Sequence, residues 1–175
     1  MSASCQPPRI RPAGPDDLPV IVEFNRRLAL ETEAKVLEPA VLEAGATIAL
    51  ADPDRLRYWV AEVPGEAQPV GQAAITREWS DWRNGWIWWL QSVYVARPFR
   101  GRGIFRALFH QIRAEARALP DVIGLRLYVE DANEPARRTY QALGMKPGGY
   151  SVYEDLWIPA WDDREPTRAR SRRRK

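Results

Sequence analysis

The chain has 175 residues, 45% of them hydrophobic, which favours one domain with a sizeable core and leaves too little sequence for two. Its formal net charge of +3 is uneven, because residues 164–175 hold seven basic residues and one glutamate, a net +6, and the remaining residues sum to −3. The only cysteine, Cys5, excludes an internal disulfide and a thiolate metal cluster, and the only histidine, His110, is the single candidate base for a serine or cysteine triad.

The two ends of the chain differ from the part between them. No apolar run of about 18 residues is present and the N-terminus has no signal segment, so we expect a cytoplasmic protein with no membrane partner. We predict a disordered leader at residues 1–8, a folded domain at 9–158 and a basic, disordered tail at 159–175. Clustered arginines bind phosphate-rich polymers, so a nucleic-acid or ribosome-associated role is a rival hypothesis for the tail alone.

The expected elements begin with a short strand and two helices. Residues 9–12 can form the strand, and Asp16 or Asp17 can cap a helix that runs to about residue 34, with apolar side chains at helical spacing. A second helix is expected at residues 39–45, with further helical turns to residue 51. Strands follow at residues 56–63, 69–79 and 86–95, joined by turns at 64–66 and 80–85.

Helices and strands alternate in the rest of the chain. We expect a helix at residues 104–119, a strand at 122–129, a helix at 134–143 and a last strand at 150–157. Gly144 is placed to end the third of these elements. This order predicts an α/β fold with a mixed, mostly antiparallel, twisted sheet of six to seven strands and about four flanking helices.

The bend between the strand at 86–95 and the helix at 104–119 is short, basic and contains Gly101 and Gly103. Such a bend directs free backbone N–H groups and the positive end of a helix dipole toward one point, which suits a phosphate. A tight turn with solvated arginines is the alternative. No P-loop is present, and Arg106 stands where the dinucleotide motif needs its third glycine. The phosphates therefore belong to something other than ATP or NAD.

Two motifs carry a resemblance to a known family. Residues 100–105, after the strand, resemble the acetyl-CoA signature Arg/Gln-x-x-Gly-x-Gly/Ala of the GNAT acetyltransferases. Residues 133–145 resemble that family's second motif, Asn-x-x-Ala-x-x-x-Tyr-x-x-x-Gly-Phe. Phe105 replaces the small residue that closes the first motif, and Met145 replaces the final Phe of the second. The resemblance covers residue 10 to about residue 156.

The resemblance implies acetyl-CoA as co-substrate, no metal, and two central strands that splay apart. The pantetheine arm would bond the backbone of Val93 and Val95, and amides of the bend would hold the pyrophosphate. Asn133 would either bond a pantetheine carbonyl or cap its helix. The implied cofactor-binding residues are Val93, Val95, Arg100, Gly101, Arg102, Gly103, Ile104, Phe105 and Asn133.

The chemistry of acyl transfer needs a neutral amine and a proton for the departing thiolate. Tyr140 falls where the family has its acidic tyrosine, and a core ring is the alternative. The base stays open, because Gln91 stands where many relatives have a glutamate. Candidate bases besides a water chain are Glu31, Glu33, Glu38, Glu78 and Asp81.

The acceptor is expected to be a small cationic amine or a peptide amine, since carboxylates and an indole face attract a cation. Glu31, Trp79 and Gln91 are the predicted acceptor-binding residues. We therefore predict an acetyl-CoA-dependent N-acetyltransferase, active as a monomer or a homodimer. A non-catalytic acyl-CoA sensor is the alternative that Gln91 keeps open, as is a protein acetyltransferase that uses the basic tail.

Overall fold

The computed structural model describes residues 6–157, and within them five strands form one sheet in the order β1-β2-β3-β4-β5. Each junction from β1 to β4 is antiparallel, and β4 and β5 are parallel. The strands are β1 Arg9–Pro12, β2 Arg57–Glu62, β3 Gly71–Ser80, β4 Gly85–Val95 and β5 Val122–Leu127. The sheet is thus mixed and mostly antiparallel as predicted, but it has five strands where the sequence predicted six to seven.

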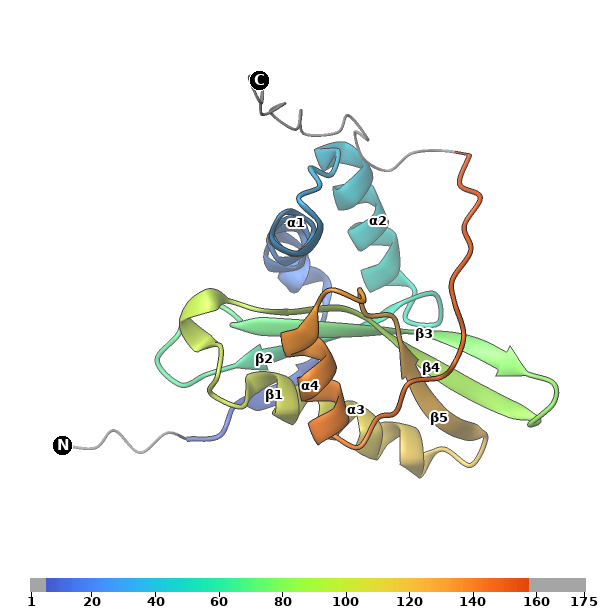
Figure 1. The fold of residues 1–175 in the computed structure, drawn as a ribbon. Helices are drawn as coiled ribbons and strands as arrows, with labels where there is room; N and C mark the ends of the chain where they lie inside the picture. Colours follow the sequence, from blue (N-terminus) through green and yellow to red (C-terminus); the bar gives the residue numbers. More distant parts are fainter. Residues whose placement is uncertain (1–5, 158–175) are drawn as a thin grey trace, which may run out of the picture.

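Helices cover both faces of the sheet (Figure 1). The first two, α1 Leu18–Glu33 and α2 Pro39–Ala51, lie on one face, and α3 Ile104–Ala118 lies on the other. A shorter helix, α4 Glu134–Ala142, follows β5. Two single turns of 3₁₀ helix, at Pro15–Asp17 and Arg97–Phe99, lead into α1 and into the bend before α3. The predicted order of helices and strands is therefore confirmed as far as α4.

Alternating side chains along the strands build two cores. The larger lies between the sheet and α3, where Trp59, Trp88, Leu108, Phe109 and Ile112 are at most 2% exposed. The smaller lies under α1 and α2. Its buried members are Ile21, Ala46, Ala49, Tyr58 and Ala74.

The strand predicted at residues 150–157 is absent from the described chain, and this accounts for the lower strand count. The segment runs extended past the sheet, with Tyr150, Tyr153 and Trp157 more than 80% exposed. Aromatic and β-branched residues favour a strand only where a neighbouring strand accepts their backbone hydrogen bonds. Pro147 and Gly149, whose φ is +76°, break the approach to β5.

Beyond Leu90, no strand of the described residues pairs with β4 on its β5 side. Pairing between the two strands ends at Leu90 and Leu127, whereas β4 continues to Val95 (Figure 1). On its other side, β4 carries a bulge against β3, where Ser92 adopts a φ of +49°. The carboxyl half of β4 therefore presents an unpaired backbone edge directly before the bend into α3.

Candidate active site

The bend between β4 and α3 has the backbone conformation that its glycines predict. Gly101 and Gly103 have φ of +74° and +79°, and no atom lies within 4 Å of a Cβ placed on either. The first backbone bond of α3 runs from the amide of Ala107 to the carbonyl of Gly103. Within residues 6–157, no backbone acceptor is recorded for the five amides from Gly101 to Phe105. An anionic ligand can approach these donors through open space.

Two arginines of the bend are tied to helix α1 through Glu31. The Glu31 carboxylate lies 2.7 Å from Arg100 and 3.2 Å from Arg97, and it accepts a 3.0 Å bond from the Tyr94 hydroxyl. Burial would raise the pKa of Glu31, but the hydrogen bonds from Arg100, Arg97 and Tyr94 outweigh it and lower the pKa to about 2. Glu31, which the sequence predicted to bind a cationic acceptor, therefore already pairs with Arg97 and Arg100 beside the bend.

The other basic side chains near the bend have no carboxylate partner in the described chain. Arg102 lies over the ring of Phe99, 5.3 Å from its centroid, and neither Arg102 nor Arg106 forms an ion pair there. Both are exposed. These two guanidinium groups are available to a phosphate-bearing ligand at the bend.

The unpaired edge of β4 is partly used by the bend itself. Arg100 Nε donates a 2.8 Å bond to the carbonyl of Val95, one of the two predicted pantetheine contacts. Val93 lies between the bulge and Val95, and the side chains of both valines pack on the α3 side of the sheet. Because a carbonyl oxygen has two lone pairs, Val95 can still accept a second bond. The role of both residues in binding stays a prediction.

Tyr140 and Phe105 meet between α4 and α3. Their rings pack edge to face with centroids 5.7 Å apart, and Phe105 also lies 6.1 Å from the Phe109 ring. The ring of Phe105 therefore packs against neighbouring aromatic side chains. Burial raises the pKa of Tyr140, and its hydroxyl has no hydrogen-bond partner in the described chain.

Asn133 caps α4 in the structure. Its side-chain oxygen accepts a 3.1 Å bond from the amide of Ala136. Of the two roles that the sequence left open, the helix cap is thus present. A bond from Asn133 to a ligand stays a prediction.

The remaining acceptor-site candidates lie apart from one another. Gln91 donates a 2.6 Å bond to Thr76, while Trp79 packs edge to face on Trp86 near the β3–β4 turn and is 47% exposed. Glu78 accepts bonds from Trp89 and Arg126. Each of the other candidate bases also has a recorded bond: Glu33 to Lys35, Glu38 to the amide of Val41, and Asp81 to the amide of Trp82.

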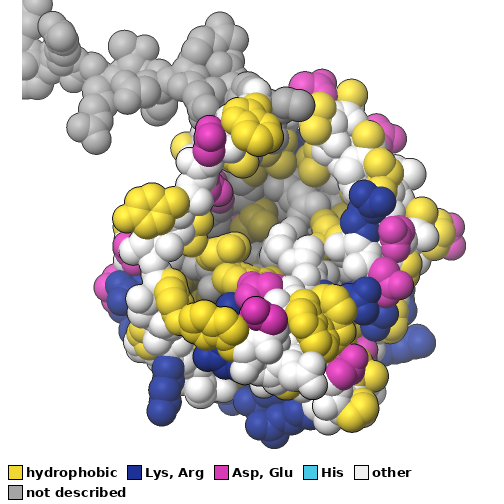
Figure 2. Space-filling view, turned by 90° about the vertical axis from the view of Figure 1, so that its right-hand side faces the viewer, with side chains coloured by type: hydrophobic (Ala, Val, Ile, Leu, Met, Phe, Trp, Pro, Cys, Tyr) yellow, Lys and Arg dark blue, Asp and Glu magenta, His cyan; other side chains and the backbone are white. Residues whose placement is uncertain are grey.

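A deep hollow opens on the side of the molecule away from β1. Figure 2 shows it above the tip of the β3–β4 hairpin, bordered by the segment 146–157. Tyr128 is 60% exposed and packs on Trp89 with ring centroids 4.3 Å apart.

Sequence reasoning missed a buried polar chain beneath the bulge. The Gln72 amide donates to Asn25 at 2.7 Å and to the carbonyl of Ser92 at 3.1 Å, and Asn25 donates to Tyr58. Gln72 is fully buried, and its side-chain oxygen has no hydrogen-bond partner in the part of the chain that the structure describes. A lone glutamine in the apolar run 70–75 was the available signal. These hydrogen bonds between side chains and to the Ser92 carbonyl fix the bulge that directs β4 toward the bend.

A family model supplies the identification that the geometry leaves open. The model of the acetyltransferase (GNAT) family matches residues 23–145, which include β4, the bend and α4. The chain belongs to the GNAT acetyltransferase family. The family resemblance that residues 100–105 and 133–145 carried is thereby confirmed. A search of curated proteins found no match to this sequence.

Solved structures agree with the GNAT assignment. A possible acetyltransferase from Clostridium difficile 630 is 42% identical, with a TM-score of 0.79 over 88% of this chain and 100% of that chain. A predicted acetyltransferase from Clostridium acetobutylicum, solved with acetyl-CoA, is 20% identical, with a TM-score of 0.68 over 85% and 96% of the two chains. At that lower identity the likeness shows the fold alone.

Among residues 6–157, none of the helices is both long enough and apolar enough to cross a membrane. The same residues contain no group of three or more histidine, cysteine, aspartate or glutamate side chains placed to hold a metal ion. The leader predicted at residues 1–8 lies mostly outside the described residues, and the basic tail predicted at residues 159–175 lies entirely outside them.

Proposed function

We propose that this GNAT protein is an acetyl-CoA-dependent N-acetyltransferase, which transfers an acetyl group from a thioester to a primary amine by direct attack. The observation that carries the proposal is the pair of free backbone surfaces around the bend. Five amides from Gly101 to Phe105 have no backbone acceptor in the described chain, and β4 has no strand partner on one side beyond Leu90. Together they offer hydrogen bonds to a phosphate and to an amide-bearing arm.

The residues of the bend fit a pyrophosphate. Open space around Gly101 and Gly103 lets an oxyanion reach the amides, and the positive end of the α3 dipole lies at the same point. Arg102 and Arg106 add charge without competing carboxylates. Glu31 holds Arg97 and Arg100 to one side. When bound, acetyl-CoA would supply the thioester whose carbonyl an amine attacks.

Tyr140 is the proposed general acid. A tyrosine can donate a proton only while it is protonated, and burial raises its pKa above the ordinary value of 10.0. Its hydroxyl also has no competing partner in the described chain. Tyr140 would therefore carry a proton throughout the neutral range and could deliver it to the departing thiolate.

The amine proton is proposed to leave through water. Gln91 cannot accept a proton, and it is already bonded to Thr76. The carboxylates of Glu31 and Glu78 each accept two or more charge-assisted or hydrogen bonds, which makes them poor bases. A cationic acceptor is still favoured by exposed aromatic faces such as those of Trp79 and Tyr128.

The experiment is a thiol-release assay with acetyl-CoA and matched acceptors. We expect turnover with a polyamine, an amino sugar or a lysine-like amine, and background rates with the corresponding alcohols. Tyr140→Phe should lower kcat by about 100-fold or more while the affinity for coenzyme A changes by less than about twofold. Tyr153→Phe is the matched control, since Tyr153 is 95% exposed and should keep full activity.

The same assay distinguishes the acyl-CoA sensor. A sensor binds coenzyme A but releases no thiol with any amine, so wild type and Tyr140→Phe would both stay at background. That result would contradict the proposed enzyme. Activity that is unchanged in Tyr140→Phe would instead remove Tyr140 from the acid role.

A further inference from the structure

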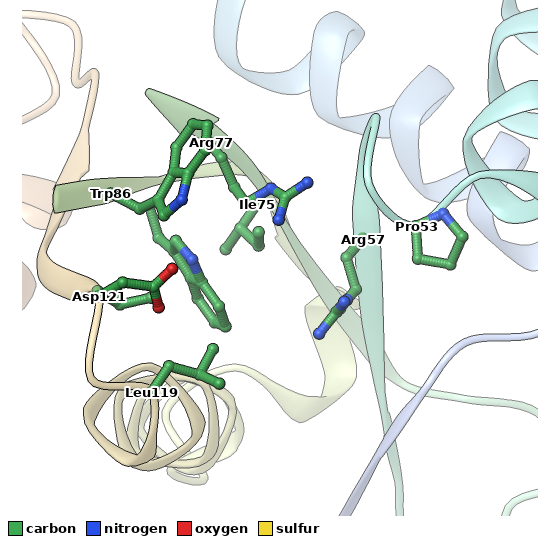
Figure 3. A pocket seen from close by; sticks show the side chains of 9 residues that line it. Pro53, Arg57, Ile75, Arg77, Trp86, Leu119 and Asp121 are labelled. Atoms are coloured by element: carbon green, nitrogen blue, oxygen red, sulfur yellow. The ribbon is translucent and has the colours of Figure 1, made fainter. Parts of the chain in front are cut away.

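A second cavity lies at the amino end of β4, away from the bend. Its volume is about 280 Å³, and Figure 3 shows side chains from several elements pointing into it. At about 3.3 Å per residue, Trp88 is more than about 20 Å along the strand from Val95. The lining residues are Pro53, Arg57, Ile75, Arg77, Trp86, Trp88, Leu119, Asp121 and Val122.

Arg57 is the most unusual residue of this cavity. Its side chain is half-buried on β2, and its guanidinium lies 5.9 Å from the centroid of the Trp59 ring. No carboxylate pairs with Arg57 in the described chain. A partly desolvated cation without a partner attracts an anionic group, because its charge is less screened than at the surface.

Arg77 places a second guanidinium beside the same space. It lies over the Trp86 ring, 5.2 Å from the centroid, and pairs with Asp54 at 3.0 Å. The Asp54 side chain is 75% exposed, so this ion pair is weak and can yield to a ligand. Arg57 and Arg77 both point into the cavity in Figure 3 and form its basic wall.

The opposite wall is acidic. Asp121 follows the C-terminal end of α3, and its backbone carbonyl accepts a 2.7 Å bond from the amide of Trp86. This bond fixes the residue against β4. Within residues 6–157 the Asp121 carboxylate has no ion pair, and in Figure 3 it lies across the cavity from Arg57.

Apolar side chains line the cavity between the charged walls. Ile75 and Trp88 are at most 2% exposed, Trp86 is half-buried, and Leu119 forms the rim at 42% exposed. Within residues 6–157, the buried indole nitrogen of Trp88 has no hydrogen-bond partner. The cavity thus combines a basic wall, an acidic wall and an apolar floor in a volume slightly below that of most drug-sized sites.

We propose that this cavity binds a free α-amino acid with an apolar side chain. The carboxylate would lie at Arg57 and Arg77, the ammonium at Asp121, and the side chain between Trp86, Trp88 and Leu119. An anion alone would leave Asp121 unpaired, and a cation alone would leave Arg57 unpaired, so a zwitterion satisfies both walls. The site is separate from the bend and goes beyond the proposed acetyl transfer.

The first test compares three probes that differ by one charged group. L-Phenylalanine, 3-phenylpropanoate and phenethylamine are titrated into the full chain by calorimetry, with tryptophan fluorescence as a second readout. L-Phenylalanine should bind, and each analogue should bind at least about tenfold more weakly, because one charged wall of the cavity then lacks its partner. Failure of L-phenylalanine and L-leucine to bind, or equal affinity for the three probes, would overturn the proposal.

Variants then locate the site. Arg57→Gln should weaken L-phenylalanine binding by about tenfold or more, and Leu119→Trp should abolish it by filling the cavity from its rim. Arg55→Gln is the matched control, because Arg55 pairs with Asp52 on the surface outside the cavity. All three variants should bind coenzyme A as wild type does, which also shows that they are folded. Unchanged amino-acid affinity in Arg57→Gln and Leu119→Trp would place the ligand elsewhere and overturn the assignment.

Discussion

The two ends of β4 use different parts of the chain to create binding surfaces. At its carboxyl end, the groups available to a ligand are backbone amides from five consecutive residues, and side chains matter mainly by being absent at Gly101 and Gly103. At its amino end, the cavity is made by side chains from β2, β3, β4 and the C-terminal end of α3. A main-chain surface can be disrupted only by added atoms, whereas a side-chain surface can also be disrupted by removing side-chain atoms.

The largest effect should come from adding atoms at the bend. Gly103→Asp places a side chain at a φ of +79° and a negative charge beside the amides, so coenzyme A affinity should fall by about 100-fold or more. Calorimetric titration measures this. Gly65→Asp is a matched control, because Gly65 has a φ of +89° in the β2–β3 turn and an aspartate there would be similarly strained. An equal loss in both variants would mean that strain, and not the bend, sets the affinity.

Removing a side chain at the same bend should matter much less. Arg102→Gln is expected to weaken coenzyme A binding only a few-fold, since an exposed charge contributes little in salt solution. This contrasts with Arg57→Gln at the other end of β4, where the missing guanidinium is half-buried. A larger loss in Arg102→Gln than in Gly103→Asp would reverse the distinction between the two ends.

A smaller effect is expected on the stability of the fold at acidic pH. Because the pKa of Glu31 is lowered to about 2 from its ordinary value of 4.5, its contribution to stability is present above pH 4.5 and is lost as pH falls toward 2. Between pH 6 and pH 3, the free energy of unfolding should therefore fall by about 1–2 kcal/mol more in wild type than in Glu31→Gln.

Urea unfolding at the two pH values measures this difference. Glu33→Gln is the matched control, because the Glu33 side chain is 52% exposed in its pair with Lys35 and should behave as wild type. Parallel pH dependence in wild type and Glu31→Gln would show that the contacts of Glu31 with Arg97 and Arg100 do not stabilise the fold.

The sequence predicted what contiguous residues determine. The bend was predictable because Gly101 and Gly103 stand at fixed places between an apolar strand and an amphipathic helix, and the positive φ of both glycines agrees with that interpretation. The cap at Asn133 follows from its position directly before α4. Such features need no knowledge of which distant segments meet.

Features that depend on distant contacts were not predictable. Nothing in the sequence indicated that the Glu31 carboxylate pairs with Arg97 and Arg100, some 70 residues further along the chain. Its role in binding the acceptor stays a prediction. The cavity around Arg57 unites residues from 53 to 122, and no spacing in the sequence indicates it. The strand expected at 150–157 is absent for the same reason. Its residues have a high strand propensity, but no neighbouring strand in the described chain pairs with them.

The most direct test of the bend is a calorimetric comparison of coenzyme A with pantetheine, which lacks the pyrophosphate and the nucleotide. If the amides from Gly101 to Phe105 donate hydrogen bonds to the pyrophosphate, coenzyme A should bind the wild-type protein at least about 100-fold more tightly than pantetheine does. Equal affinities, or no detectable binding of coenzyme A, would contradict it.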